Sequence, residues 1–308
     1  MTQYTLLFPG QGSQYVGMGK SFFDQDFGRK LLAQAEDILA LPLKRLMLEG
    51  PQAELTQTAV AQPAILLHSY AAFLYYVDNY QHAPSAVLGH SLGEYSALVA
   101  AGVLSFEDAL LTVRKRGLFM QEAVSVDSGA MAAVLGLDVD SISRVLEDFC
   151  DETQANYAAV ANYNGPAQTV IAGTKLGIKQ ASERLKQAGA KRVLELDVSA
   201  PFHCALMKSV KIKMAGVLDK INFQDAQVPV ISNVSAQPET NKEIIKNLLL
   251  EQIANPVRFT DCVNTILAHK LMGAGFIELG PKNILSGIVR KINPEFFIAH
   301  IDSVEDRI

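Results

Sequence analysis

Short apolar runs alternate with stretches of helical periodicity along most of this chain. The apolar runs contain few charges and lie at 4–8, 86–88, 228–233, 275–279 and 299–302. Runs of this kind are typical of strands buried on both faces of a parallel sheet. Apolar positions recur at helical spacing at 27–40, 43–49, 95–101, 105–123, 244–254, 258–270 and 283–292, and a long amphipathic helix is expected after Pro63 within 56–80. Strands alternating with helices predict an α/β fold.

The pattern changes between residues 127 and 196. Four strands and two helices are expected there, in the order β-α-β-β-α-β, which is that of a ferredoxin-like split unit. The strands are expected at 130–136, 157–163, 168–172 and 192–198, and the helices at 139–149 and 176–188. We therefore predict two domains. A large catalytic domain, 1–126 and 197–308, has a hydrolase-like, mainly parallel sheet flanked by helices, and a small ferredoxin-like (βαββαβ) subdomain, 127–196, is inserted in it.

The pentapeptide Gly89-His90-Ser91-Leu92-Gly93 joins the strand 86–88 to the helix 95–101. A G-x-S-x-G motif between a strand and a helix is the signature of a nucleophile elbow. Glycine is required two positions before and two positions after the serine, because a side chain there would clash in so sharp a turn. The N–H of Leu92 then points from a helix N-terminus toward the position where an oxyanion would form. Ser91 is therefore the predicted nucleophile.

Composition narrows the class of protein without deciding its function. The chain has 308 residues, of which 49% are hydrophobic and 19% charged, as in a globular enzyme with a large core. The net charge of −5 argues against a nucleic-acid partner. No apolar run is long enough to span a membrane, and the N-terminus does not resemble a signal peptide. The three cysteines are widely spaced, which favours reduced thiols in the cytoplasm and neither a disulfide nor a metal site.

Two further residues are candidates for chemistry. Arg116 lies on or beside the apolar stripe of the helix 105–123, and a guanidinium there needs an anion, either a substrate or a structural partner. His203 follows a strand end in an irregular loop and is the strongest candidate for a general base. The nearest upstream acid, Asp197, is interpreted as structural.

The glycine-rich loop 9–19 follows the first strand. A dinucleotide-binding loop is disfavoured, because bulky Tyr15 occupies a position that requires glycine or alanine. We expect this loop to bring backbone N–H groups close to a substrate.

Motifs spread over nearly the whole chain carry a family resemblance. They are Phe8-Pro-Gly-Gln-Gly-Ser13, Gln62-Pro-Ala-Ile65, Gly89-His-Ser-Leu-Gly-Glu94, Arg116-Gly117, Gly129-Ala-Met131, the segment 199–207 and Asn255-Pro-Val257. In this order they resemble the malonyl-CoA:acyl-carrier-protein transacylases of bacterial type II fatty acid synthesis. Polyketide-synthase acyltransferases share the pattern, so it indicates the chemistry more firmly than the pathway.

The resemblance implies a role for each catalytic residue. Ser91 would carry the acyl group, with His203 as its base. The backbone carbonyl of Gln252 would orient the histidine, and the N–H groups of Gln11 and Leu92 would form the oxyanion hole.

The resemblance also implies substrate contacts. Arg116 would hold the free carboxylate of a malonyl group, which a guanidinium binds through two parallel hydrogen bonds. His90 would lie beside that carboxylate, and Asn162 would line the path of the pantetheine arm. Phe202 before the base, together with Leu92, is common in relatives that prefer malonyl.

The expected substrates are malonyl-CoA and the phosphopantetheine thiol of an acyl carrier protein, which would bind transiently. No bound cofactor or metal is expected, and the protein is expected to be a monomer. Two rival functions stay open: a serine esterase or thioesterase on the same elbow, and a non-catalytic module that binds a carrier protein. Because such carriers are acidic, a local basic patch is expected, and its candidate residues are Lys191, Arg192, Lys208 and Arg258.

Overall fold

A computed structural model describes residues 2–123, 129–198 and 200–308 of the chain. Its large sheet has six strands in the order β10-β9-β1-β2-β7-β8. The first five strands in this order pair in parallel, and β8 alone is antiparallel to its neighbour. The strands are β1 (Thr5–Phe8), β2 (Ala86–Gly89), β7 (Val230–Ile231), β8 (Pro238–Glu239), β9 (Phe276–Leu279) and β10 (Ile298–Ile301). The predicted mainly parallel α/β sheet is confirmed.

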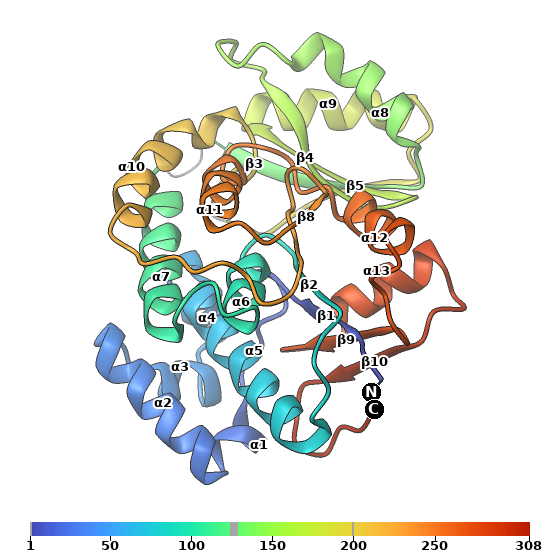
Figure 1. The fold of residues 1–308 in the computed structure, drawn as a ribbon. Helices are drawn as coiled ribbons and strands as arrows, with labels where there is room; N and C mark the ends of the chain where they lie inside the picture. Colours follow the sequence, from blue (N-terminus) through green and yellow to red (C-terminus); the bar gives the residue numbers. More distant parts are fainter. Residues whose placement is uncertain (1, 124–128, 199) are drawn as a thin grey trace.

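Helices cover both faces of this sheet, which explains the apolar runs (Figure 1). Successive strand residues point to opposite faces. Leu6 and Phe8 of β1 join the core beneath the N-terminal helices, whereas Leu7 joins the core beneath the C-terminal helices. The helices concerned are α5 (Thr58–Tyr80), α6 (Gly93–Ala100) and α7 (Phe106–Glu122) on one side, and α12 (Phe259–Ala268) and α13 (Ile284–Ile292) on the other.

Close packing of α5 against α7 places Arg116 near the centre of the molecule. Pro63 lies inside α5 and cannot donate to the carbonyl of Ala59. The guanidinium of Arg114 from α7 donates to this carbonyl instead, at 2.6 Å. A Cβ on Gly117 would lie 2.7 Å from the Cα of Ala59, so only glycine permits this approach. The Arg116-Gly117 pair therefore combines a functional side chain with the contact that positions it.

A second sheet lies beside the first, at the top of Figure 1. It has four antiparallel strands in the order β4-β5-β3-β6. One face packs against α8 and α9, while Met131 and Ala161 on the other face belong to the main core. The segment after α11 (Lys242–Glu251) is tied to β4 by two backbone hydrogen bonds of 2.9 Å, made by both the N–H and the carbonyl of Val257. The elements are β3 (Gly129–Leu135), α8 (Val139–Leu146), β4 (Ala158–Gly165), β5 (Gln168–Thr174), α9 (Lys175–Gln187) and β6 (Arg192–Glu195).

Some elements differ from the sequence-based expectation. The helix predicted after Pro63 begins earlier, at Thr58, and the proposed amphipathic character is wrong, because its N-terminal two thirds are buried on nearly every side. The strand expected at 228–233 has only two residues in β7. The domain boundary proposed at 126/127 falls outside the described residues. The sequence did not predict α1 (Lys20–Phe23), α4 (Gln52–Thr56), α10 (Lys208–Leu218) or β8, whereas α2 (Asp26–Leu39) and α3 (Leu43–Leu48) were expected.

No helix within the described part of the chain is long and apolar enough to cross a membrane.

The hydrogen bonds between Glu278 of β9 and the start of α13 join the sheet to a helix, and their contribution to stability can be measured. This fully buried carboxyl in β9 accepts hydrogen bonds from the N–H groups of Leu285 and Ser286 at the start of α13, at 3.0 and 2.7 Å. Glu278→Leu would leave both N–H groups without an acceptor, which should lower the free energy of unfolding by about 2–4 kcal/mol. Glu278→Gln keeps one carbonyl oxygen and should cost less. Urea unfolding measures both, and equal stability of the Leu variant and the native protein would contradict this account.

Candidate active site

The turn after β2 holds Ser91 in a left-handed conformation, with φ of 52°. This conformation is uncommon for a residue with a side chain and is found at functional sites. A Cβ on Gly89 would lie 1.9 Å from the backbone of Gly93, and one on Gly93 would lie 2.0 Å from the carbonyl oxygen of Phe8. Both glycines are thus required by backbone contact. The strand, turn and helix have the geometry of a nucleophile elbow.

Ser91, His203 and Gln252 form a hydrogen-bonded line. The Oγ of Ser91 lies 2.7 Å from Nε2 of His203, and Nδ1 of His203 lies 2.8 Å from the backbone oxygen of Gln252. Because a carbonyl only accepts, Nδ1 carries the proton, and Nε2 offers its lone pair to the serine hydroxyl. His203, which the sequence placed in an irregular loop, is buried and has φ of 60°.

Arg116 approaches the serine from α7 and is also buried. Its Nη2 donates to Oγ of Ser91 at 3.1 Å and to Oε1 of Gln252 at 3.0 Å. Its Nη1 donates to Oε1 of Gln62 at 3.0 Å, and its Nε has no partner among the described residues. The guanidinium therefore donates its hydrogen bonds to oxygens that carry no charge.

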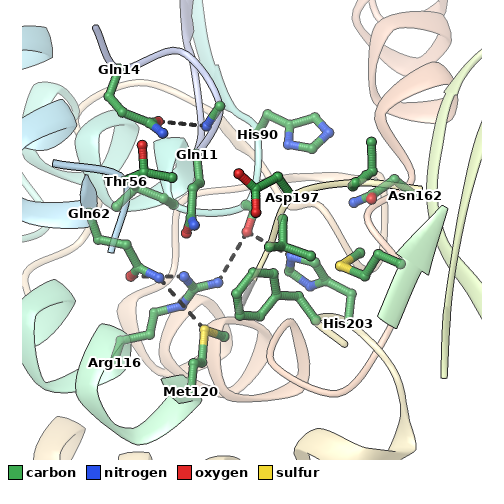
Figure 2. A pocket seen from close by; sticks show the side chains of 17 residues that line it. Gln11, Gln14, Thr56, Gln62, His90, Arg116, Met120, Asn162, Asp197 and His203 are labelled. Atoms are coloured by element: carbon green, nitrogen blue, oxygen red, sulfur yellow. Dashed lines mark hydrogen bonds between the residues drawn. The ribbon is translucent and has the colours of Figure 1, made fainter. Parts of the chain in front are cut away.

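These residues surround a cavity of about 330 Å³ (Figure 2). The cavity is large enough for a small acyl group and the end of the chain that carries it. It has Arg116 and Gln62 on one side and His203 on the other. All other predicted site residues except Gln252 line it as well, namely Gln11, His90, Ser91, Leu92, Asn162 and Phe202. The structure thus brings the predicted residues together.

His90 and Asn162 lie on the side of the cavity formed by β4. Nε2 of His90 lies 2.8 Å from Oδ1 of Asn164, a contact that the sequence did not suggest. The amide oxygen accepts, so Nδ1 of His90 is left as an acceptor. The Nδ2 of Asn162 is buried in the cavity wall and has no hydrogen-bond partner among the described residues. It is a donor that a bound molecule could satisfy.

Asn233, Glu94 and the side chain of Gln252 were missed as site residues. Oδ1 of Asn233 accepts from the N–H of Ser91 at 2.7 Å, and its Nδ2 donates to the carbonyl of Gly89 at 2.6 Å, so it holds the elbow in shape. Asn233 follows β7 at the carboxyl edge of the sheet, and this position is the signal that could have identified it. Nε2 of Gln252 donates to Oε2 of Glu94 at 2.8 Å and to the carbonyl of Ser91 at 2.9 Å.

Burial and the guanidinium set the charges in the site. Burial, followed by the positive charge of Arg116, lowers the pKa of His203 to about 3, so this histidine is neutral at physiological pH. Burial raises the pKa of Glu94 to about 7, against the lowering effect of its hydrogen bonds. Burial also lowers the pKa of Arg116, yet a guanidinium stays charged at any physiological pH. The site therefore combines a neutral base with a buried cation.

Other candidates are placed away from this chemistry. Cys204 is buried, and burial raises the pKa of its thiol to about 12, which makes it a poor nucleophile. Asp197 is exposed and lines the cavity, and among the described residues it has no hydrogen bond to His203, which bonds to Ser91 and Gln252 instead. In the expected basic patch, Lys208 pairs with Glu152 at 2.6 Å and Arg258 with Asp261 at 2.8 Å, so two of its four charges are partly compensated.

Comparison with known proteins identifies the family. Residues 5–293 match the model described as acyl transferase domain. The chain belongs to the acyl transferase family. The malonyl CoA-acyl carrier protein transacylase of Bacillus subtilis (strain 168) is 48% identical over 294 residues, which are 95% of this chain and 91% of that protein.

Solved structures of acyl transferases agree with this assignment. An acyl carrier protein S-malonyltransferase from Vibrio cholerae superposes with a TM-score of 0.93 and 38% identity over 99% of this chain and 98% of its own. A malonyl-transacylase in complex with its type II PKS acyl-carrier protein gives a TM-score of 0.93 and 39% identity over 98% and 97%.

The low pKa of His203 leads to a direct test in this acyl transferase. Nitrogen-15 NMR of the imidazole should show His203 neutral at about pH 5, where an ordinary histidine is mostly protonated. In Arg116→Gln, its titration midpoint should rise, because a cation that disfavours the protonated ring is gone. The His203→Gln variant assigns the signal. A native midpoint near the ordinary pKa of histidine would contradict the described burial and charge.

Proposed function

We propose that this protein transfers the malonyl group from malonyl-CoA to the phosphopantetheine thiol of an acyl carrier protein, through a malonyl ester on Ser91. The observation that carries this proposal is the contact of one serine, Ser91, with both a neutral base, His203, and a buried cation, Arg116. The pair of Ser91 and His203 is suited to acyl transfer, and the cation Arg116 is suited to bind an acyl group that has a free carboxylate. The names of its close relatives support the same substrates.

The first half of the reaction forms the ester. Nε2 of His203 takes the proton of Ser91 Oγ as this oxygen attacks the thioester carbonyl. Gln11 and Leu92 line the cavity, and their backbone N–H groups would stabilise the developing oxyanion. When the tetrahedral intermediate collapses, the C–S bond breaks, and His203 returns the proton to the sulfur of CoA. The second half runs in reverse, with the carrier thiol giving its proton to His203.

The third member of the catalytic line favours transfer over hydrolysis. A carboxylate would stabilise the imidazolium that forms, whereas the carbonyl of Gln252 is neutral, and His203 is a weak base with a pKa of about 3. The carrier thiol, with a pKa of about 8.5, gives up its proton more readily than water, with a pKa of about 16, and is therefore the favoured second nucleophile. This preference argues against the esterase alternative.

Malonyl is favoured over uncharged acyl groups by Arg116. A malonyl carboxylate could accept the hydrogen bond that Nη2 now donates to Ser91. A carboxylate there would also offset the positive charge that lowers the pKa of His203, and so strengthen the base when the correct substrate is bound. Acetyl-CoA would do neither.

The remaining predictions are part of the same proposal. Residues 127–196 form an inserted subdomain whose strands β3 and β4 supply Met131 and Asn162 to the cavity wall. The reaction needs no bound cofactor or metal, because base, cation and N–H donors come from the chain itself. We propose a cytoplasmic monomer that supplies fatty acid synthesis. Comparing kcat/KM for fatty acid and polyketide carrier proteins would test the pathway.

The nucleophile is tested by intact-protein mass. The native protein mixed with malonyl-CoA should gain one malonyl group on the peptide that contains Ser91, and Ser91→Ala should gain none. Ser96→Ala, which removes a buried hydroxyl further along α6, is the matched control and should still be acylated. Initial rates with malonyl-CoA and carrier should give parallel double-reciprocal lines. Full transfer by Ser91→Ala would refute the ester, and acylation followed by rapid release to water would favour the esterase.

The role of Arg116 is tested by comparing two thioesters. Arg116→Ala should lower kcat/KM for malonyl-CoA by roughly 10²–10³-fold, since a buried carboxylate would lose its partner. Acetyl-CoA should react as before or faster. Arg116→Lys should recover only part of the malonyl rate, because an ammonium lacks the two-pronged geometry. Arg114→Ala removes a neighbouring cation outside the cavity and should leave the ratio unchanged; equal losses for both thioesters in Arg116→Ala would show a structural role instead.

A further inference from the structure

Both arms of the Arg116 guanidinium are held by side-chain amides. Nη1 donates to Oε1 of Gln62 and Nη2 to Oε1 of Gln252, each at 3.0 Å. Within the described part of the chain, no carboxylate lies within hydrogen-bonding distance of this guanidinium. Buried arginines are usually paired with an acid, so this arrangement is unusual and requires an explanation.

Each amide is also fixed in the orientation that presents oxygen to the cation. Nε2 of Gln62 lies 3.6 Å from the sulfur of Met120. Nε2 of Gln252 donates to Glu94, so a flipped amide would face its oxygen toward a carboxyl and its N–H groups toward the guanidinium. Among the described residues, Glu94 has no hydrogen bond to Arg116. It is joined to the guanidinium by the amide of Gln252 and otherwise acts on it only by its charge at a distance. The guanidinium is positioned by hydrogen bonds but keeps its charge.

We infer that Gln62, together with Gln252, is a specificity-determining residue that orients Arg116 without neutralising it, so that the charge stays available for the carboxylate of the substrate. This inference rests on the proposed function and extends it from Arg116 to the residues that position it. A carboxylate in place of either amide would accept the same hydrogen bond from Arg116, but it would also neutralise the positive charge of the guanidinium. The choice of amide over carboxylate at this position would then decide between malonyl and uncharged acyl groups.

The test is Gln62→Glu, which changes one amide to a carboxylate of the same shape. The new carboxylate, hydrogen-bonded to Arg116, would repel the carboxylate of the malonyl group. The ratio of kcat/KM for malonyl-CoA to that for acetyl-CoA should therefore fall roughly 10²-fold or more. The acetyl rate should hold or rise. Gln62→Met, which removes the hydrogen bond without adding charge, should lower the ratio less.

A second measurement separates this role from a general loss of structure. His203 faces Arg116 of α7 and His90 of the elbow, while Glu94 lies beyond Gln252. Neutralising Arg116 should therefore raise the NMR titration midpoint of His203 in Gln62→Glu, but not in Gln62→Met.

Gln121→Glu is the matched control. Gln121 also lies on α7, but its Oε1 accepts from the N–H of Ala59 at 2.7 Å, and it does not line the cavity. The substitution adds the same charge without touching Arg116, so the ratio and the His203 midpoint should both stay at native values.

The outcomes decide the inference separately from the proposed function. If the native protein gains no malonyl on Ser91, the proposed function fails. If it does, and Gln62→Glu keeps the native ratio and His203 midpoint, only the inference fails. If Gln62→Glu does not fold by thermal melting, Gln62→Met decides: a selective loss of malonyl transfer supports the inference, and an equal loss for both thioesters overturns it.

Discussion

The geometry of the site depends on Gln252, a fully buried residue at the end of α11. Its carbonyl fixes the ring of His203, its Oε1 holds Arg116, and its Nε2 bonds to the carbonyl of Ser91. The nucleophile, the base and the cation are thus all positioned by hydrogen bonds to one residue. Val257, soon after it, is bonded to β4, which connects this arrangement to the second sheet. The site therefore needs no separate acid to hold the histidine in place.

The buried cation explains several features that look unrelated when taken singly. Removing a guanidinium from water is costly, and the usual remedy is a carboxylate partner. Here amide oxygens supply hydrogen bonds, and the ring of Tyr95 lies 5.6 Å from the guanidinium carbon, where its π-face attracts positive charge. Neither neutralises the charge, which then acts on His203 and lowers its pKa. Burying Arg116 without a carboxylate partner costs stability. In return, its charge keeps His203 neutral and can bind an anionic group of the substrate.

The sequence predicted the parts of this site that depend on backbone geometry. A strand, a sharp turn and a helix leave Ser91 few alternatives, because the contacts at Gly89 and Gly93 exclude side chains. Strands were found because burial on both faces requires apolar runs. The side-chain network was not predictable in this way, since Glu94 meets Gln252 and Asn233 only after distant segments converge. The helix α10 was missed as well, and β8 is too short to leave a pattern.

The expectation about Gln252 covered only its backbone and shows what sequence motifs leave out. The resemblance assigned it a backbone role, which suggests that its side chain could be removed at little cost. In the structure that side chain hydrogen-bonds directly to both Glu94 and Arg116. A backbone carbonyl can be offered by any residue, but an oxygen facing a cation and an N–H facing an acid require an amide of this length. The contact with Arg116 therefore explains why this residue is a glutamine, and the contact of its backbone carbonyl with His203 explains where it lies.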